Sequence, residues 1–300
     1  MKGAAPAQAT RGHPAPPASR RGPQFSGRAL CWLGSVVVAA VFLAPLLWML
    51  AASMRETSTI FRDDPFTWLT TWSGWTLGHY ADAWRRADFG RALLNTILQV
   101  VIIAGGGLIV NTMAAFAFAR LDFYGREVGF AVLVMLIILP VEVLAVPMFF
   151  TARDLGLTGG IGPAMAGLSL PFVAKAFNIY FLRQHFLRVP VELEEAGVLD
   201  GASVWHQFRH IALPAVKPAL ATVVLLDVLV HWSDFLWPLM IATRAETRTV
   251  QLGLANLFTQ PPLDWGAILA CAVLATLPVL VLFRWFQRYL VASDTRAGIK

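Results

Sequence analysis

Six long apolar runs constrain this chain more than any other feature of its sequence. They cover residues 30–52, 93–119, 128–150, 160–182, 219–243 and 266–290. A helix of about 20 apolar residues crosses a hydrocarbon core about 30 Å thick, and each run has at least that length. With 57% hydrophobic and only 14% charged residues, the composition also excludes an ordinary soluble domain. The sequence therefore predicts an all-α, polytopic membrane protein with six transmembrane helices.

Several residues inside the runs interrupt or crowd a helix. Pro140 and Pro147 lie in the third run, which we therefore expect to be kinked. Glycines 105–107 lie in the second run, where they favour close helix packing. They do not indicate a phosphate loop, because no Lys directly follows a Gly in this chain. Cys31 and Cys271 lack metal-ligand spacing and are expected to be small buried residues rather than a disulfide.

The segments between the runs indicate the orientation. Residues 1–28 are rich in Ala, Pro, Gly and Arg without apolar periodicity, which predicts a disordered tail rather than a cleaved signal peptide. The net charge of +6 does not indicate a nucleic-acid partner, because the basic residues lie in short segments beside the runs. Segments 1–28, 120–127, 183–217 and 284–300 hold more Lys and Arg than the segments on the other side. Both termini are therefore expected in the cytoplasm of a multi-pass protein of the bacterial-type cytoplasmic membrane.

Residues 190–214 form a polar segment between the fourth and fifth runs. Pro190 suits the first turn of a helix, and Gly201 interrupts the helical pattern. Asp200 is expected to cap a second short helix. Three glutamates, Glu192, Glu194 and Glu195, lie near the positive end of the first helix dipole, where negative charge is favourable. Two short helices joined at a bend with small side chains are predicted.

At this segment the chain resembles the permease subunit of ATP-binding cassette (ABC) importers. The family's cytoplasmic loop carries Glu-Ala-Ala, then a Gly, then Ile-x-Leu-Pro, matched here by Glu195, Ala196, Gly197, Gly201, Ile211, Leu213 and Pro214. The carbohydrate-type, maltose-permease-like form adds Asp-Gly-Ala-Ser, matched by Asp200, Gly201, Ala202 and Ser203. Gly197 departs from the usual second Ala, which weakens the first helix by up to about 1 kcal/mol but keeps the spacing.

The resemblance extends over roughly residues 30–300. It includes Asn95 and Thr96 near the start of the second run and the stretch 117–121, followed by Gly125 and Arg126. The usual Trp-Asn-Asp-Phe of the family reads Trp232, Ser233, Asp234 and Phe235 here. Ser233 therefore replaces the usual Asn, which puts any hydrogen bond of that amide in doubt.

The resemblance implies a six-span permease domain over residues 29–300 with a cytoplasmic coupling helix in the 190–214 loop. The residues expected to couple to an ATPase are Glu195, Ala196, Asp200, Gly201, Ala202, Ser203, Phe208 and Pro214. The implied partners are two cytoplasmic ABC ATPase subunits, a second and commonly different permease, an extracytoplasmic solute-binding protein and the lipid bilayer. No enzyme activity and no cofactor are expected, because the chain has no Walker A sequence and its ATP hydrolysis must occur in a partner.

Ionisable residues inside membrane spans are costly and by default suggest function. The candidate translocation path comprises Glu142, Lys175, Asn178, Asp227, Trp232 and Asp234. Lys175 could equally pair with Glu142 or Asp227 only to fix helix packing. Neutral polar groups and aromatic faces favour a sugar path, whereas the acids favour a proton or sodium path.

Other functions remain open at this point. An ion-coupled secondary transporter would use Glu142 and Asp227, and an ABC permease for a non-sugar solute, a membrane enzyme or an assembly scaffold are further alternatives. His206 and His210 are four residues apart, but no third ligand accompanies them, so no metal site is expected. The Trp-rich segment 66–84 suits a membrane interface, with sugar stacking or docking of a binding protein as alternatives.

Overall fold

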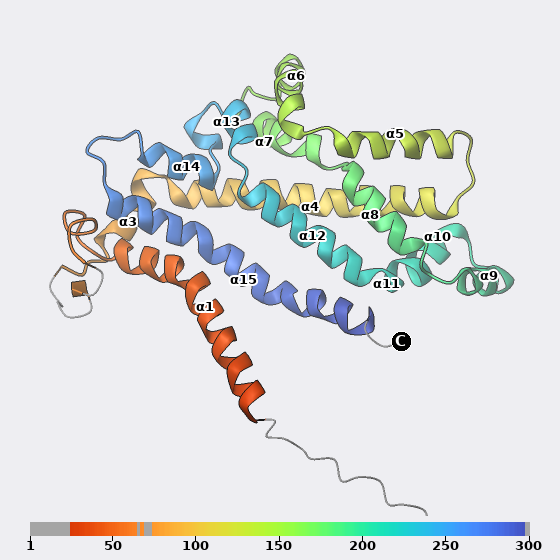
Figure 1. Cartoon of the computed structure of the whole chain (residues 1–300). Coiled ribbons are helices and arrows are strands. Elements are labelled where there is room, and N and C mark those ends of the chain that lie inside the picture. The colour runs from red at the N-terminus through yellow and green to blue at the C-terminus, as the bar shows by residue number, and fades with distance from the viewer. Residues whose placement is uncertain (1–24, 65–66, 69–73, 298–300) are drawn as a thin grey trace, which may run out of the picture. The chain divides into compact units, whose positions relative to one another are not determined.

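The structure is a computed structural model that describes residues 25–64, 67–68 and 74–297. Every regular element within these ranges is a helix, which confirms the all-α prediction (Figure 1). The chain divides into two compact units, residues 1–48 and 49–300.

The first unit contains most of α1, which extends over Phe25–Ser53. Its part Cys31–Ser53 is long and apolar enough to cross a membrane. Large apolar side chains such as Phe42 are exposed along it, as is typical of a surface that faces lipid. The helix begins at Phe25, so residues 25–28 are helical and do not belong to the predicted disordered tail. The rest of that tail, residues 1–24, lies outside the described residues.

Two further single helices are long and apolar enough to cross a membrane. They are α4, Phe89–Arg120, and α15, Trp265–Ala297, of which Trp265–Gln287 is the apolar part. α4 packs against α7 (Ile161–Ser169), α8 (Ala176–Phe186), α12 (Lys217–Trp232) and α14 (Val250–Leu257). α15 packs against α3 (Gly78–Arg86), α12 and α14 (Figure 1). These two helices are the scaffold on which the remaining elements of the second unit are placed.

The third predicted span is broken rather than merely kinked. α5, Arg126–Ile138, and α6, Val141–Asp154, meet at an angle of 105°. Pro140 explains the position of the break, because a proline disfavours helical backbone in the residue before it. Leu139 accordingly has extended backbone, with ψ 119°. Pro147 lies inside α6 without ending it.

The fourth predicted span is also discontinuous. It consists of α7, Ile161–Ser169, the 3₁₀ turn η1, Leu170–Phe172, and α8, Ala176–Phe186. Its two parts, Ile161–Phe172 and Ala176–Phe186, are bent by 46°.

The fifth predicted span, residues 219–243, ends as a helix at Trp232 rather than at residue 243. α12 extends over Lys217–Trp232, and the separate helix α13 follows at Leu236–Ile241. The chain then passes through η3, Ala245–Thr247, and α14, Val250–Leu257, before α15. With its three bent pairs counted as spans, the described chain has up to six spans, as predicted.

The polar segment before α12 forms short helices, as predicted. α9 covers Val191–Leu199, and α10, Val204–Gln207, continues through the π-helical turn η2, Phe208–Ala212, into α11, Leu213–Ala215. The run Val204–Ala215 is bent by 76° from α12.

The largest core cluster joins this segment to the spans. It includes Phe116 of α4, Leu182 and Phe186 of α8, Phe208 of η2 and Val223 of α12, all buried. The Phe116 ring lies 5.7 Å from the Phe186 ring and 5.1 Å from the Phe208 ring, centroid to centroid. The short helices are thus fixed to the membrane helices by aromatic packing.

Candidate functional site

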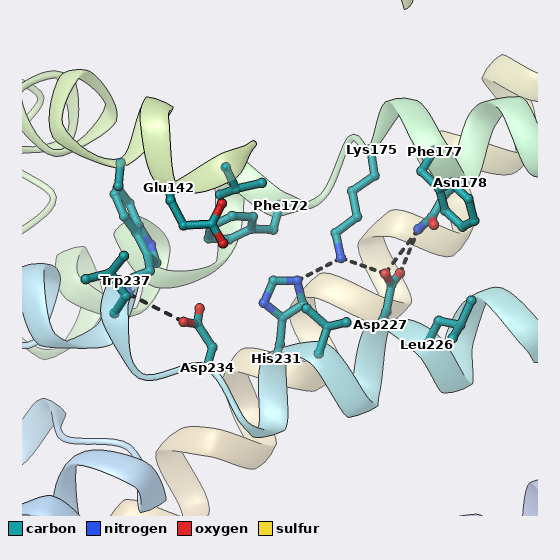
Figure 2. A pocket seen from close by; sticks show the side chains of 14 residues that line it. Glu142, Phe172, Lys175, Phe177, Asn178, Leu226, Asp227, His231, Asp234 and Trp237 are labelled. Atoms are coloured by element: carbon teal, nitrogen blue, oxygen red, sulfur yellow. Dashed lines mark hydrogen bonds and ion pairs between the residues drawn. The ribbon is translucent and has the colours of Figure 1, made fainter. Parts of the chain in front are cut away.

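A cavity of ≈ 560 Å³ lies where the broken helices meet, between α6, the η1–α8 region, α12 and α13 (Figure 2). Most of its lining is aliphatic or aromatic, including Phe172, Phe177 and Trp237. The polar side chains that line it are Glu142, Lys175, Asn178, Asp227, His231 and Asp234. The structure therefore brings together five of the six residues predicted for the path.

Lys175 is at the centre of a hydrogen-bonded group on one side of the cavity. Its Nζ lies 2.6 Å from Asp227 Oδ1 and 2.7 Å from His231 Nε2. Asn178 Nδ2 donates to both carboxylate oxygens of Asp227, at 3.1 and 2.9 Å. Of the two partners expected for Lys175, Asp227 is therefore the one it binds. Both charges of the pair are compensated, as a membrane interior requires.

The backbone near Lys175 is held by a side chain from another helix. Where the helix is interrupted between η1 and α8, Asn111 of α4 donates from Nδ2 to Val173 O at 3.0 Å. Its Oδ1 accepts from the Lys175 backbone N–H at 2.9 Å. Asn111 thus satisfies the backbone groups that the break leaves open. Gly107 allows this approach, because a Cβ there would lie 3.1 Å from Val173 O.

The other two acids lie on the opposite side of the cavity from Asp227 in Figure 2. Asp234 Oδ1 accepts from the Trp237 backbone N–H at 3.4 Å, next to the start of α13, whose N-cap position is Phe235. Within the described part of the chain, neither Glu142 nor Asp234 has a cationic partner at salt-bridge distance. This end of the cavity therefore carries acceptors without compensating positive charge.

Trp232, the sixth residue predicted for the path, does not line the cavity. Its Nε1 donates to Ala275 O of α15 at 3.0 Å, and the side chain is buried between α12 and α15. His231, which the sequence analysis did not select, takes the place next to Lys175. The signal for it was present: His231 lies four residues after Asp227, and residues i and i+4 share one helix face.

The segment 190–214 has the bend predicted at Gly201, whose φ is +79°. The cap of the second short helix is Ser203, whose Oγ accepts from His206 N at 3.3 Å, and not Asp200 as predicted. Asp200 is instead the C-terminal cap residue of α9. A Cβ on Gly197 would lie 2.9 Å from Ile211 Cδ1, so the departure from Ala at this position fits the close packing of α9 on η2.

The predicted coupling residues divide into exposed and buried ones. Glu195, Ala196, Asp200, Gly201, Ser203 and Pro214 are exposed and Ala202 is half-buried, whereas Phe208 is buried in the core cluster. An open pocket of ≈ 420 Å³ is lined by Gly197, Asp200, Gly201, Ala202, Ser203, His206 and Ile211. The sequence analysis missed the structural role of Glu194, which is buried and binds Arg120 of α4.

The region before α3 and the turn before α15 form a second polar cluster. Asp264 accepts from Thr57 Oγ1 at 2.8 Å and from the Ala267 backbone N–H at 3.1 Å, and lies 3.5 Å from Arg86 Nη1. Burial alone would raise the pKa of Asp264, but these hydrogen bonds and the nearby His79 and Arg86 lower it overall. Among the predicted tryptophans nearby, Trp68 is buried, Trp75 and Trp84 are exposed, and Trp72 lies outside the described residues.

Comparison with known proteins adds to this geometry. Residues 107–293 match the family described as "Binding-protein-dependent transport system inner membrane component". The chain is 32% identical to the diacetylchitobiose uptake system permease protein NgcG of Streptomyces coelicolor, over 91% of this chain and 87% of the relative. It is 30% identical to the arabinooligosaccharides transport system permease protein AraQ of Halalkalibacterium halodurans, over 90% and 97%.

A solved structure has the same fold. It is described as a bacterial ABC transporter involved in the import of the acidic polysaccharide alginate. The superposition has a TM-score of 0.71 at 23% identity and covers 92% of this chain and 99% of that chain.

Proposed function

This chain belongs to the family of binding-protein-dependent transport system inner membrane components, and we propose that its cavity is part of the translocation path of a sugar or sugar-like solute. As an ABC importer permease, the chain is a multi-pass inner-membrane protein that works with ATPase subunits and a solute-binding protein. It is not itself the enzyme of the system.

One observation carries the proposal: polar groups from three discontinuous spans converge on one cavity within the apolar region. Broken helices at membrane depth are tolerated where the backbone is buried in protein or lines a cavity. Aromatic faces of Phe172 and Trp237 beside hydrogen-bonding groups suit a carbohydrate ring. The sugar class also has the support of NgcG and AraQ, whose names refer to diacetylchitobiose and arabinooligosaccharides.

We also propose that residues 190–214 couple the path to two cytoplasmic ATPases. The exposed residues around Gly201 form an open pocket, while Phe208 and Glu194 bind the same segment to α4 and the core. A partner that moves the exposed side would therefore move the membrane helices as well. This assignment requires both termini in the cytoplasm, in agreement with the distribution of basic residues.

A second, different permease completes the proposed assembly. The cavity has apolar lining residues that are exposed in the single chain, among them Val141, Val230 and Leu236. α5 also exposes a row of large side chains, including Val128 and Met135. A second permease packed against this side would enclose the path between two subunits, with alternating access arising as the ATPases close on ATP.

The test is obstruction of the cavity in the assembled importer. Val230→Trp fills space in the cavity and should abolish solute uptake into proteoliposomes, whereas basal ATP hydrolysis persists. Ile109→Trp, at an exposed position of α4 outside the cavity, is the matched control and should transport normally. Normal uptake by Val230→Trp would contradict the path. Uptake that needs a pH gradient but no nucleotide would instead favour the ion-coupled alternative.

A further inference from the structure

The charges that line the cavity do not cancel. Among the residues that line the cavity, only Lys175 carries a full positive charge. Asp227 compensates this charge, with its Oδ1 at 2.6 Å from Lys175 Nζ. Glu142 and Asp234 remain, so the cavity carries up to two uncompensated negative charges. In a cavity with mostly apolar walls, such charges attract a cationic solute and repel an anionic one.

His231 adds a hydrogen-bond donor with no partner. The Lys175 ammonium group has only donors, so His231 Nε2 must accept from it, and the proton of the neutral ring is on Nδ1. His231 is 4% exposed, and its Nδ1 has no hydrogen-bond partner in the described structure. The ring lies 4.8 Å from the Phe172 ring, centroid to centroid, and lines the cavity (Figure 2). A buried donor without a partner costs free energy unless a ligand accepts from it.

We propose that this cavity takes a solute that bears hydroxyl or ammonium groups and no negative charge, with His231 donating to an uncharged oxygen and Glu142 and Asp234 accepting from the solute. The proposal rests on the proposed function, which it deepens by naming the charge class of the solute. A phosphate or uronate group would face two carboxylates without a free cation to bind it. Phe172 and Trp237 supply the apolar surface for the ring faces of the same solute.

The charge part of the proposal can be tested without knowing the solute. Val230→Cys places a thiol in the cavity, in a Cys31→Ser background, while Cys271 is fully buried and can stay. In the assembled importer, the rates of modification by a cationic and an anionic methanethiosulfonate reagent are measured, each normalised to its rate with 2-mercaptoethanol. We expect the cationic reagent to react roughly tenfold faster.

Charge-neutral variants show which residues cause the difference. Glu142→Gln combined with Asp234→Asn should bring the ratio of the two rates close to one. Glu246→Gln, which removes an exposed acid outside the cavity, is the matched control and should leave the ratio unchanged. A ratio that favours the anionic reagent, or one that the double variant does not change, would overturn the proposal.

Two substitutions distinguish the roles of the two nitrogen atoms of His231. The amide of His231→Gln reaches the position of Nε2 and can still accept from Lys175, but no donor remains at Nδ1. The amide of His231→Asn lies near Nδ1 and keeps the donor. We expect the half-saturating solute concentration for uptake to rise about three- to tenfold in the Gln variant and to change less in the Asn variant. The reverse order would show that His231 acts only through Lys175.

The proposed function has its own readout in the same thiol experiment. Solute-loaded binding protein with ATP should slow the modification of Val230→Cys if the solute passes through the cavity. Absence of this protection, with the preference for the cationic reagent intact, would contradict the path and leave the charge of the cavity established. Protection together with a preference for the anionic reagent would contradict only the charge class.

Discussion

Arg120 and Glu194 form an ion pair that joins the last residue of α4 to the first half of α9. Arg120 Nε lies 2.8 Å from Glu194 Oε1, and each side chain is only 10% exposed. Arg120 Nη2 also donates to Val189 O at 2.6 Å. The two bonds hold the segment 190–214 at a fixed position against the end of a long span, independently of the aromatic core.

Removing one member of this pair should uncouple segment 190–214 from α4. Glu194→Ala leaves the Arg120 charge buried without its carboxylate, which typically costs about 3–5 kcal/mol. We expect solute-stimulated ATP hydrolysis of the assembled importer to fall strongly while membrane insertion persists. Glu195→Ala, at the adjacent exposed position, is the matched control and should have a smaller effect. Equal ATPase rates in both variants would show that the ion pair is not needed for coupling.

Replacing Asn111 should destabilise the break between η1 and α8. Asn111→Leu deprives Val173 O and Lys175 N of their partners, and an unsatisfied buried polar group costs about 1–3 kcal/mol. A lower thermal unfolding midpoint in detergent is expected, with Asn256→Leu on α14 as the control. A wild-type midpoint would mean that another group satisfies this backbone.

The lowered pKa of Asp264 predicts a pH-dependent stability. Because its pKa is lower in the folded protein than the ordinary value of 3.8, the ionised group stabilises the fold above that value. This contribution is lost as the pH falls through the folded pKa. The unfolding midpoint of Asp264→Asn should therefore lie below that of the wild type at neutral pH, and the difference should shrink below about pH 4. Asp154→Asn, at an exposed position, is the matched control; a difference between Asp264→Asn and the wild type that persists unchanged in acid would refute the assignment.

A substitution of Gly201 tests the proposed contact of segment 190–214 with an ATPase without disturbing packing inside the chain. A Cβ at this position meets nothing within 4 Å, so a side chain causes no clash inside the chain. The φ of +79° favours Gly, and Asn tolerates it better than most residues. We expect Gly201→Asp to abolish solute-stimulated ATP hydrolysis, because its charge would be unpaired in a close contact beside Asp200. Gly201→Asn has the same shape without the charge and should retain more activity. Wild-type stimulation in the Asp variant would exclude this stretch from the contact with an ATPase.

The positions of the spans could be predicted from the sequence, but their continuity could not. Apolar length located all six regions, and Pro140 indicated an interruption in the third. The break before α8 follows Pro171 closely, but its backbone geometry also depends on Asn111, a residue of another helix that the local sequence cannot indicate. The end of α12 at Trp232 is marked by the polar residues Ser233 and Asp234, but the apolar length up to residue 243 outweighed them in the prediction.

The candidate site was predictable in its residue types but not in its pairings. Charged residues in apolar runs identified Glu142, Lys175, Asp227 and Asp234 for the cavity. Periodicity along one helix cannot give distances between helices, so the partner of Lys175 stayed open until the structure placed Asp227 beside it. The same holds for Trp232, which lies away from the cavity and donates from Nε1 to Ala275 O of α15. A lone His in an apolar run carries little weight by itself, which is why His231 was missed.

The π-helical turn at Phe208–Ala212 sets the rotation of the short helix before it, α10, relative to the helices that follow. An α-helix advances about 100° per residue, and a π turn accommodates one residue more than an α turn. Phe208 faces the core from this turn, and Ser203 and His206 lie in the open pocket on the short helices before it. A chain shortened by one residue within the turn would rotate these pocket residues by about 100° relative to α12. The number of residues in this turn therefore sets which face of the segment is exposed for the ATPase contact that we propose.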